Sequence, residues 1–376
     1  MKKIQMVDLK GQYEAIKETV NNSIQEVLDT NTYINGPQVQ QFQKNLETYL
    51  CVKHVIPCAN GTDALQIAMM GLDLKPGDEV ITADFTFAAT VEVIALLQLT
   101  PVLVDVDLVN MNISIEAIKK AITPKTKAIV PVHLFGRAAN MEAIMRIAKE
   151  FNLYVIEDNA QAIGANCKFS DGAKLKAGTI GHVGSTSFFP SKNLGCYGDG
   201  GAIFTNDDAL AHKIRGIVNH GMYVRYHHDV VGVNSRLDSI QAAVLNAKLP
   251  LLDQYNTARQ NAARKYSAAF EGHKNIVAPS ICDICDCHVF HQYTLRIIDG
   301  DRDGLMQHLL DKGIPCAIYY PIPLHSQKAY LDARYKEEDF PVTNLLAKQV
   351  ISLPMHTELD DEQIKFITDS LLEYLK

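Results

Sequence analysis

Lys192 stands where an apolar run gives way to a stretch rich in glycine. Phe188, Phe189 and Pro190 precede it, and glycines recur between residues 195 and 201. Proline ends a strand, and glycines let the backbone pass close to a ligand. A lysine in such an apolar place has a lowered pKa, so its neutral amine can attack an aldehyde. A solvated loop lysine is the alternative interpretation.

Two adjacent acids, Glu157 and Asp158, close another apolar run. A carboxylate at the carboxyl end of a parallel strand can face a bound ligand. It can keep a ring nitrogen of a cofactor protonated, so that the ring draws electrons from a reacting carbon. An aspartate that caps a helix or forms a turn has the same local pattern.

Two further segments could bind a flat, phosphorylated ligand. Residues 58–64, Cys-Ala-Asn-Gly-Thr-Asp-Ala, form a polar glycine turn that opens a helix. Free N–H groups and the positive helix end there could hold a phosphate, although a simple helix cap is the commoner outcome. Phe87 follows the run 79–82 and could stack on a ring, but an aromatic there is more often core.

The elements that must position these residues alternate along the chain. Short apolar runs are followed by segments with helical spacing, which predicts an α/β fold with a mostly parallel sheet. The four segments then meet at the carboxyl ends of the strands. The predicted strands are 79–82, 102–106, 128–132, 153–157, 185–189 and 202–205, and the predicted helices are 62–72, 114–122, 141–151 and 207–218.

A different alternation follows near residue 250. Residues 235–249 read as a helix that Ser235 caps and Pro250 closes. We therefore predict a large domain over residues 1–250 and a smaller α+β domain over residues 251–376. Its predicted elements are helices at 255–270, 302–312 and 361–375 and strands at 292–298 and 316–320.

The composition is that of an ordinary globular protein. The 376 residues are 47% hydrophobic, and 36 basic against 43 acidic side chains give a net charge of −7. No block of like charge favours nucleic acid, and no apolar run is long enough to span a membrane. The eight cysteines do not form a disulfide framework. We expect a cytoplasmic protein with reduced thiols.

Taken together, these motifs resemble the DegT/DnrJ/EryC1/StrS aminotransferases of pyridoxal-phosphate (PLP) fold type I. The resemblance implies a large domain with a mostly parallel seven-stranded sheet between helices, a smaller α+β C-terminal domain, and pyridoxal 5'-phosphate as cofactor. The matching stretches are 59–65, 85–90, 102–107, 157–161, 187–201, 234–238 and 320–324, which span nearly the whole chain.

Carried over by position, the resemblance gives each residue of the cofactor site a role. Lys192 holds PLP as a Schiff base and later moves a proton. Asp158 pairs with the pyridine nitrogen. Phe87 stacks on one face of the ring, and Gln161 lies against it near its hydroxyl group. The phosphate is held by Gly61, Thr62 and Ser187, and by Asn234 of the partner subunit.

Residues 186–201, 225–228 and 231–238 are similar to one subgroup. That subgroup aminates UDP-2-acetamido-2-deoxy-3-oxo-glucuronate in O-antigen (lipopolysaccharide) biosynthesis. The similarity implies a UDP-sugar substrate, glutamate as amino donor, and a homodimer with shared active sites. Arg236, also from the partner, would meet the sugar carboxylate, because its fork matches a carboxylate. Tyr320 would line the sugar side, and the further substrate candidates are Tyr319, Tyr226, His227 and His228.

The chain departs from its relatives in places. Tyr319 stands where members of the subgroup can have histidine, and Asn159 stands where many relatives have alanine or cysteine, a change we expect to be tolerated. The chain also contains a C-x2-C-x-C-H cluster, whose first cysteine pair has the spacing of metal ligands. No second pair of cysteines or histidines follows at the distance found in zinc fingers, so we expect no bound metal. The cluster consists of Cys282, Cys285, Cys287 and His288.

Several alternatives stay open at this point. The substrate could be a 3- or 4-keto 6-deoxysugar carried by dTDP or UDP. A non-catalytic regulatory protein could bind the PLP-sugar adduct without turnover. A dehydratase on the same scaffold would have histidine in place of Lys192, and a nicotinamide dehydrogenase would have the G-x-G-x-x-G turn that the first strand here lacks.

Overall fold

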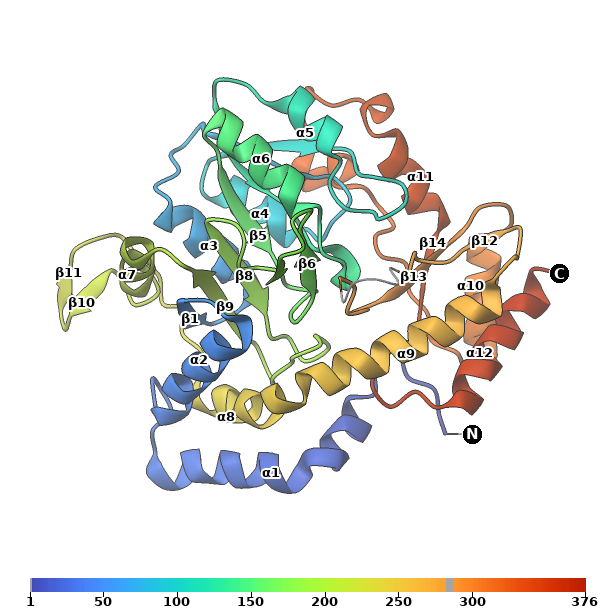
Figure 1. Cartoon of the computed structure of the whole chain (residues 1–376), viewed down its shortest axis with the longest axis horizontal. Coiled ribbons are helices and arrows are strands. Elements are labelled where there is room, and N and C mark those ends of the chain that lie inside the picture. The colour runs from blue at the N-terminus through green and yellow to red at the C-terminus, as the bar shows by residue number, and fades with distance from the viewer. Residues whose placement is uncertain (1, 282–286) are drawn as a thin grey trace.

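A seven-stranded sheet forms the centre of the molecule (Figure 1). The computed structural model describes residues 2–281 and 287–376. The strand order is β1-β9-β8-β5-β4-β2-β3, and only β9 runs antiparallel to its neighbours. The expected mostly parallel sheet is confirmed. Its strands are β1 (His54–Cys58), β2 (Glu79–Ala83), β3 (Thr100–Val104), β4 (Thr126–Val130), β5 (Tyr154–Asp158), β8 (Val183–Ser187) and β9 (Gly201–Thr205).

Alternating side chains of the strands bury both faces of this sheet. Ile156 of β5 packs into the core on one face, and its neighbour Val155 packs into the core on the other. Successive side chains of a strand point to opposite faces, so a sheet covered on both sides needs apolar residues at nearly every position. This explains why the strands read as continuous apolar runs.

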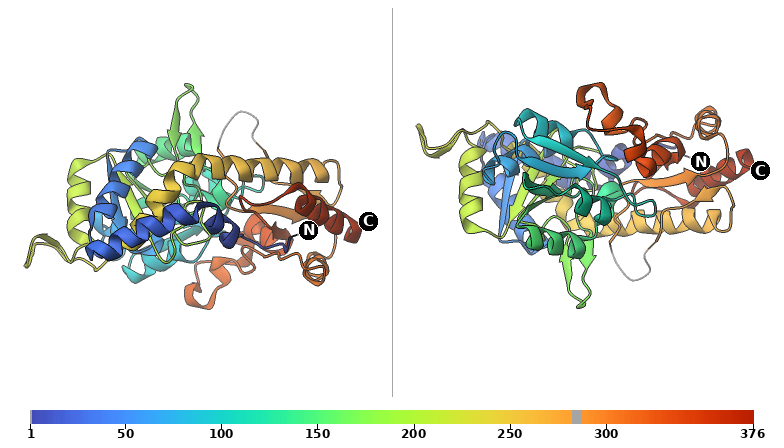
Figure 2. Two further views of the ribbon diagram at one scale, coloured as in Figure 1. Left: turned by 90° about the horizontal axis from the view of Figure 1, so that it is seen from below. Right: turned by 90° about the horizontal axis from the view of Figure 1, so that it is seen from above.

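Helices supply the two outer layers (Figure 2). The core of the first face includes residues from α3 (Gly61–Gly71), α4 (Ala89–Leu96) and α7 (Asp208–Ile217). The second face is covered by α5 (Ile115–Ala121) and α6 (Met141–Phe151) at one end, and by α2 (Pro37–Leu50) and α8 (Ser239–Lys248) at the other. The long helix α1 (Leu9–Thr30) packs against α8.

The C-terminal part has a core of its own. The three-stranded sheet β12-β13-β14 packs its apolar side chains against α9, α10 and α12, and Ile4 from the N-terminal segment joins this cluster. The division at residues 250 and 251 stays a prediction. These elements are β12 (Ile276–Val277), β13 (Tyr293–Ile297), β14 (Val350–Leu353), α9 (Leu252–Phe270), α10 (Arg302–Asp311), α11 (Pro341–Gln349) and α12 (Asp361–Tyr374).

Two antiparallel ribbons leave the main body (Figures 1 and 2). One pairs β6 (Asn166–Lys168) with β7 (Lys174–Lys176), and the other pairs β10 (Met222–Val224) with β11 (His227–His228). Short 3₁₀ turns complete the chain: Leu134–Gly136, Leu249–Leu251, Leu324–Ser326, Lys328–Tyr330 and Glu337–Asp339.

Most predicted elements are confirmed to within three residues at each end, and α6 matches at both ends. The predicted strand at 316–320 is wrong. Only Ala317 forms a bridge, to Ser352 on the outer edge of β14, and the pairing does not extend along the segment. The cap at Ser235 is also wrong. Helix α8 begins at Ser239 after Asp238, and the buried Ser235 hydroxyl accepts a hydrogen bond from the N–H of Ala59 (3.1 Å).

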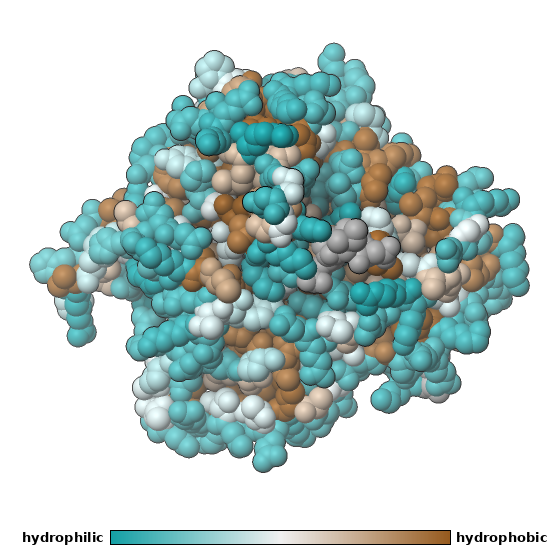
Figure 3. All heavy atoms as spheres, in the orientation of Figure 1, coloured by the Kyte–Doolittle hydropathy of each residue, from teal (hydrophilic) through white to brown (hydrophobic). Residues whose placement is uncertain are grey.

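Some elements have no counterpart among the predictions. Among the helices and strands they are α1, α2, α4, α11, β1, β6, β7, β10, β11, β12 and β14. Polar side chains cover much of the viewed face, with smaller apolar patches between them (Figure 3). Within the described ranges, no helix has both the length and the apolar character needed to cross a bilayer.

Candidate active site

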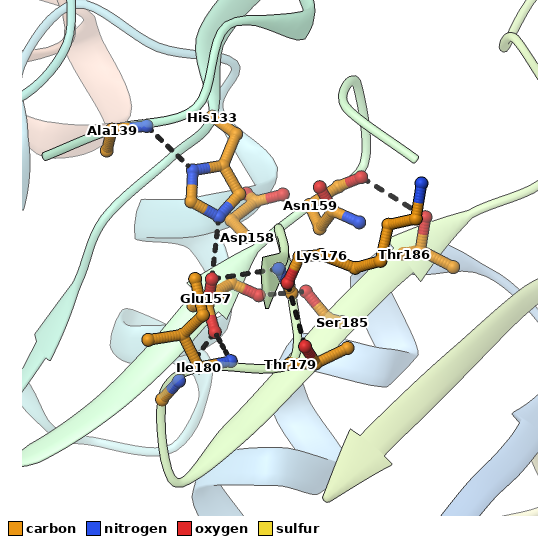
Figure 4. A network of polar contacts seen from close by, with 12 residues as sticks. His133, Ala139, Glu157, Asp158, Asn159, Lys176, Thr179, Ile180, Ser185 and Thr186 are labelled. Carbon is orange, nitrogen blue, oxygen red and sulfur yellow. Dashed lines mark hydrogen bonds and ion pairs between the residues drawn. The ribbon is translucent and has the colours of Figure 1, made fainter. Parts of the chain in front are cut away.

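The two acids that end β5 have different surroundings. The Glu157 carboxylate is fully buried and accepts hydrogen bonds from the N–H groups of Gly178 (2.8 Å), Ile180 (2.6 Å) and Gly181 (2.6 Å) (Figure 4). The imidazole Nε2 of His133 contacts the same carboxylate at 2.9 Å. With its acceptor sites filled in this way, Glu157 holds the loop before β8 and has no capacity left for a ligand.

Asp158 is the acid that remains available. Its carboxylate accepts a hydrogen bond from the Thr90 hydroxyl (2.8 Å) and one from the N–H of Ala160 (3.2 Å). A carboxylate can accept about four hydrogen bonds, so capacity remains. Sequence reasoning missed Thr90, although it lies in the matching stretch 85–90 and its fully buried hydroxyl orients Asp158.

Lys192 lies in the turn that follows β8. Its N–H donates to the carbonyl of Phe189 (2.8 Å), and its side chain is half-buried. Burial lowers the pKa of the amine to about 8, and the charge of Asp158 acts against that shift. In the described part of the chain, no hydrogen bond or ion pair engages the Lys192 amine. Lys192 is therefore an amine with a substantial neutral fraction close to an available carboxylate.

The turn after Lys192 is anchored from several sides. Asn193 donates to Asn256 of α9 (2.8 Å) and to the carbonyl of Val289 (3.0 Å). The amine of Lys248, at the end of α8, donates to the carbonyl of Gly195 (2.8 Å). A Cβ at Gly195 would lie 2.4 Å from the carbonyl oxygen of Pro190, so only glycine permits this turn.

The start of α3 forms the candidate phosphate site. Asn60 caps the helix by accepting from the N–H of Asp63 (2.8 Å), which leaves the N–H groups of Gly61 and Thr62 free of helical partners. A Cβ at Gly61 would lie 2.7 Å from the Cβ of Ser187, so the Ser187 hydroxyl sits beside this helix start. Three donors and the helix dipole suit a phosphate group.

Aromatic rings surround Gln161 at the same edge of the sheet. The Gln161 amide accepts from the N–H of Phe135 (2.6 Å) and donates to the Tyr320 hydroxyl (3.1 Å). The Tyr320 ring lies 6.3 Å from the ring of Phe87, which is 58% exposed, and 6.0 Å from that of Phe85. An aromatic ring with so much free surface beside the site can stack on a flat ligand.

The remaining substrate candidates fall into two groups. Tyr319 is half-buried next to Tyr320, with ring centroids 6.0 Å apart. Asn234 pairs with Asn219, and Arg236 donates to the Asn219 side chain (3.3 Å) on the segment that leads into α8. Tyr226, His227 and His228 are exposed on the β10–β11 ribbon, which projects from the body (Figure 1). Within the described residues, no hydrogen bond or ion pair joins them to Lys192 or Asp158.

Part of the cysteine cluster can be placed. Cys282 and Cys285 lie outside the described residues. His288 is buried, its ring stacks on Phe290 (3.8 Å between centroids), and its Nδ1 accepts from the N–H of Phe290 (3.1 Å). Burial and the nearby Arg137 lower the pKa of His288 to about 3. The packing of this imidazole explains its presence without a ligand.

The residues of the described chain fit PLP as a ligand. They offer an amine for the aldehyde, a carboxylate for the ring nitrogen, an exposed aromatic ring for stacking, and a helix start with free N–H groups for the phosphate. All of these groups come from one chain. Among the described residues, no hydrogen bond or ion pair joins Arg236, Asn234 or the ribbon residues to them.

Comparison with known proteins agrees with this arrangement. The DegT/DnrJ/EryC1/StrS aminotransferase family matches residues 14–372. The chain is 46% identical over 368 residues to a UDP-2-acetamido-2-deoxy-3-oxo-D-glucuronate aminotransferase of Pseudomonas aeruginosa, covering 98% of this chain and 99% of that protein. It is 44% identical to a UDP-N-acetyl-3-dehydro-alpha-D-glucosamine 3-aminotransferase of Acidithiobacillus ferrooxidans, covering 96% and 95%.

A third relative carries another description. A pleiotropic regulatory protein of Geobacillus stearothermophilus is 44% identical, with 99% of both chains covered. Among solved structures, that of S. venezuelae DesV in complex with a ketimine intermediate superimposes with a TM-score of 0.95 at 36% identity, covering 100% of this chain and 99% of that one. The chain belongs to the DegT/DnrJ/EryC1/StrS aminotransferase family.

Proposed function

We propose that this aminotransferase uses PLP to transfer an amino group from glutamate to the keto group of a nucleotide-linked sugar. The observation that carries the proposal is the half-buried amine of Lys192, with its lowered pKa, near the available carboxylate of Asp158. Family membership and the likeness to sugar aminotransferases over nearly the whole chain support it.

Bound PLP would supply an aldehyde that accepts an amino group and a ring that withdraws electrons. Lys192 would bind that aldehyde through its neutral amine. Once displaced, it would move a proton to and from the substrate carbon that carries the transferred nitrogen. Asp158, oriented by Thr90, would hold the proton on the ring nitrogen. Because these groups are fixed by the ends of β5 and β8, little reorganisation is needed during the reaction.

Other residues of the chain would orient the cofactor. The N–H groups of Gly61 and Thr62 and the Ser187 hydroxyl would bind its phosphate. Phe87 would stack on one face of its ring, and Gln161, held by Phe135 and Tyr320, would lie near its hydroxyl group. In this proposal the start of α3 binds the cofactor phosphate, and the residues at the end of β5 and in the turn after β8 carry out the chemistry.

For the substrate we propose UDP-2-acetamido-2-deoxy-3-oxo-glucuronate, aminated at the keto carbon for O-antigen biosynthesis. The support is the likeness to the Pseudomonas protein and the presence of Arg236, whose guanidinium suits a sugar carboxylate. Tyr319 and Tyr320 would line the sugar. A UDP-linked keto sugar without a carboxylate is favoured instead by the Acidithiobacillus relative.

We further propose a homodimer with shared active sites. Asn234 would reach the phosphate, and Arg236, Tyr226, His227 and His228 would reach the sugar nucleotide, each from the partner's side. The support is that the β10–β11 ribbon projects from its own chain with its side chains exposed. Exposed apolar residues such as Leu28, Tyr33 and Ile34 near the end of α1 would be covered in such an assembly.

A regulatory function is the second candidate, because one close relative is described as a regulatory protein. A sensor would need only to bind the PLP-sugar adduct. It would have no need for an amine whose pKa lies near neutrality at the end of β8. Turnover therefore separates the two functions.

The test is to incubate the holoenzyme with glutamate and a panel of 3-keto and 4-keto sugars carried by UDP or dTDP. Mass spectrometry should detect an amino sugar, with an equal amount of 2-oxoglutarate, and most product should form from the 3-oxo-glucuronate. Lys192→Ala is the control. Absence of product from every sugar, with retained binding of the adduct, would favour the regulatory function.

A further inference from the structure

A buried pair, Asp84 and His325, joins two distant turns beside the active site. Asp84 follows β2 directly, and its carboxylate is fully buried. It accepts hydrogen bonds from the N–H of His325 (2.7 Å) and, at 2.7 Å, from its imidazole Nδ1. The carbonyl of Asp84 also accepts from the N–H of Leu324 (3.3 Å). One residue therefore fixes the turn at 324–325 through three bonds.

Each end of the pair is close in sequence to an aromatic residue of the site. Asp84 precedes Phe85 and Phe87, and His325 follows Tyr320 by five residues. The rings of Phe85 and Phe87 lie 6.0 and 6.3 Å from that of Tyr320. The pair thus ties the turn that carries Phe87 to the turn that carries Tyr319 and Tyr320.

Apolar contacts already hold the segment that contains His325. The imidazole stacks on Phe340 at 4.4 Å with an interplanar angle of 9°. Leu324 and Phe340 pack with Val91 and Leu103 in a small core of their own. Docking of the segment therefore does not require a buried carboxylate, which is costly to desolvate and often adds little net stability. What the polar pair adds is a defined direction and register for the turn.

The two ring nitrogens of His325 have different surroundings. Nδ1 donates to Asp84, while Nε2 is buried and has no hydrogen-bond partner in the described chain. A neutral ring with its proton on Nδ1 leaves only a lone pair unpaired, which costs less than an unpaired N–H. The pair is thus a directional contact between a buried carboxyl group and a buried imidazole.

We propose that Asp84 and His325 are positioning residues for the sugar half of the reaction. They hold the Tyr319–Tyr320 turn at a set separation from Phe87, and this separation is the width of the space in which the keto sugar reacts. The inference rests on the proposed function and extends it, since it names residues that the sugar half-reaction needs and the glutamate half-reaction does not. Both half-reactions use Lys192 and Asp158, which this pair does not touch, whereas only the sugar half-reaction also relies on the Tyr319–Tyr320 turn to line its substrate.

Three variants separate positioning from plain structure. Asp84→Ala removes both side-chain bonds, and His325→Phe removes the imidazole bond while keeping the stack on Phe340. In Asp84→Asn the amide oxygen can accept from the backbone N–H and the amide nitrogen can donate to Nδ1 of the other histidine tautomer. It should therefore keep the geometry and the rate of the sugar half-reaction, at some loss of stability because the Nε2–H of that tautomer is buried without a partner.

Asp105 provides the matched control. It follows β3 as Asp84 follows β2, and its carboxylate accepts from the N–H groups of Val342 (2.9 Å) and Thr343 (2.9 Å) and from the Thr343 hydroxyl (2.8 Å). It therefore ties the sheet to α11 with as many bonds, but none of them reaches residues 319–325. Asp105→Ala should lower stability without a preference for either half-reaction.

The measurement is the rate of each half-reaction in a single turnover of the holoenzyme. One reaction mixes the PLP form with glutamate, and the other mixes the pyridoxamine form with the UDP-linked 3-keto sugar. Displacing a substrate-positioning group by about 1 Å can cost roughly 10²-fold in rate. We expect Asp84→Ala and His325→Phe to slow the sugar half-reaction by roughly 10- to 100-fold, with the glutamate half-reaction within about threefold of wild type.

Two results would overturn the positioning role. One is an unchanged sugar half-reaction in His325→Phe, which keeps its apolar packing even if Asp84→Ala does not fold. The other is an equal loss in both half-reactions that Asp105→Ala reproduces and Asp84→Asn does not rescue. A wild-type enzyme that fails with every keto sugar would instead overturn the proposed function, and the inference with it.

Discussion

The pocket around Lys192 and the β10–β11 ribbon differ in how far one chain completes them. In the pocket, hydrogen bonds fix the turn that carries Lys192, the carboxylate of Asp158 and the start of α3. On the ribbon, Tyr226, His227 and His228 are exposed, and the ribbon has little core of its own. The difference teaches that one chain brings together most of the groups proposed to hold the cofactor. In the proposed dimer, a second chain would supply the remaining groups, most of them on the sugar side.

The largest effect on activity is expected from removing the Lys192 amine. Lys192→Ala should lower turnover by roughly 10³-fold or more, because binding alone remains when the nucleophile is lost. The proper control is Lys248→Met, which removes another lysine whose pKa burial lowers to about 8. Steady-state assays with glutamate and the keto sugar measure both. Substantial turnover by Lys192→Ala would contradict the account.

The two acids of β5 should respond in opposite ways. Asp158→Asn should lower turnover by roughly 10²-fold and change the unfolding free energy little, because its role is to hold a proton on a ligand. Glu157→Ala should lower the unfolding free energy by about 3 kcal/mol or more, because it leaves four donors unpaired, two of them fully buried. Thermal unfolding and single-turnover rates measure the two effects. Similar behaviour of both variants would remove the distinction.

Mixing two inactive variants would sharpen the comparison between pocket and ribbon. If Arg236 serves the partner's pocket, a heterodimer of Lys192→Ala with Arg236→Ala has one intact site. Random re-association should then restore about a quarter of the wild-type sites. By itself, Arg236→Ala should raise KM for the sugar by roughly 10- to 100-fold. A mixture that stays as inactive as its components would place Arg236 and Lys192 in the same chain's site.

The lowered pKa of Lys192 predicts a pH dependence. Burial brings that pKa to about 8, so the amine loses its proton as the pH rises through this value. The rate at which the apoenzyme takes up PLP should therefore rise about tenfold between pH 7 and pH 9 and then level off. Stopped-flow absorbance measures the uptake. A rate that still climbs steeply above pH 9 would indicate an ordinary, solvated lysine.

The smallest effect is expected at Asn159, next to Asp158. Both polar atoms of its buried side chain lack hydrogen-bond partners within the described residues (Figure 4). Asn159→Ala should leave the unfolding free energy unchanged or raise it by about 1 kcal/mol, because an unpaired buried amide is removed. Chemical denaturation measures this. A clear loss of stability would contradict this prediction, because it would mean that the Asn159 amide has a hydrogen-bond partner in the folded protein.

The sequence predicted the sheet because strands buried on both faces are continuous apolar runs. It also predicted α6 from its helical spacing, and the structure adds the cap at Asn140. It could not predict β1, whose five residues include a proline and a histidine, or the pairing that leaves 316–320 with one bridge. These outcomes depend on which strands are already paired, and that is decided far away in the chain.

In the candidate site, too, local sequence pattern predicted some residues and missed those that depend on distant contacts. Lys192, Asp158 and Gly61 stand at strand ends or helix starts, where local pattern indicates position. Thr90 and the pair Asp84–His325 depend on contacts over distances of 68 and 241 residues in sequence, which no local pattern encodes. Which role each site residue plays stays a prediction, as does the cytoplasmic location.

One measurement tests the central claim most directly. The holoenzyme is reduced with borohydride, digested, and mapped by mass spectrometry to find the lysine that carries the cofactor. Lys248 is the informative competitor, since its pKa is also about 8 but its amine is bound to the carbonyl of Gly195 and lies over the ring of Tyr197. The account predicts the label on Lys192 alone. A label on Lys248, or on any lysine other than Lys192, would contradict it.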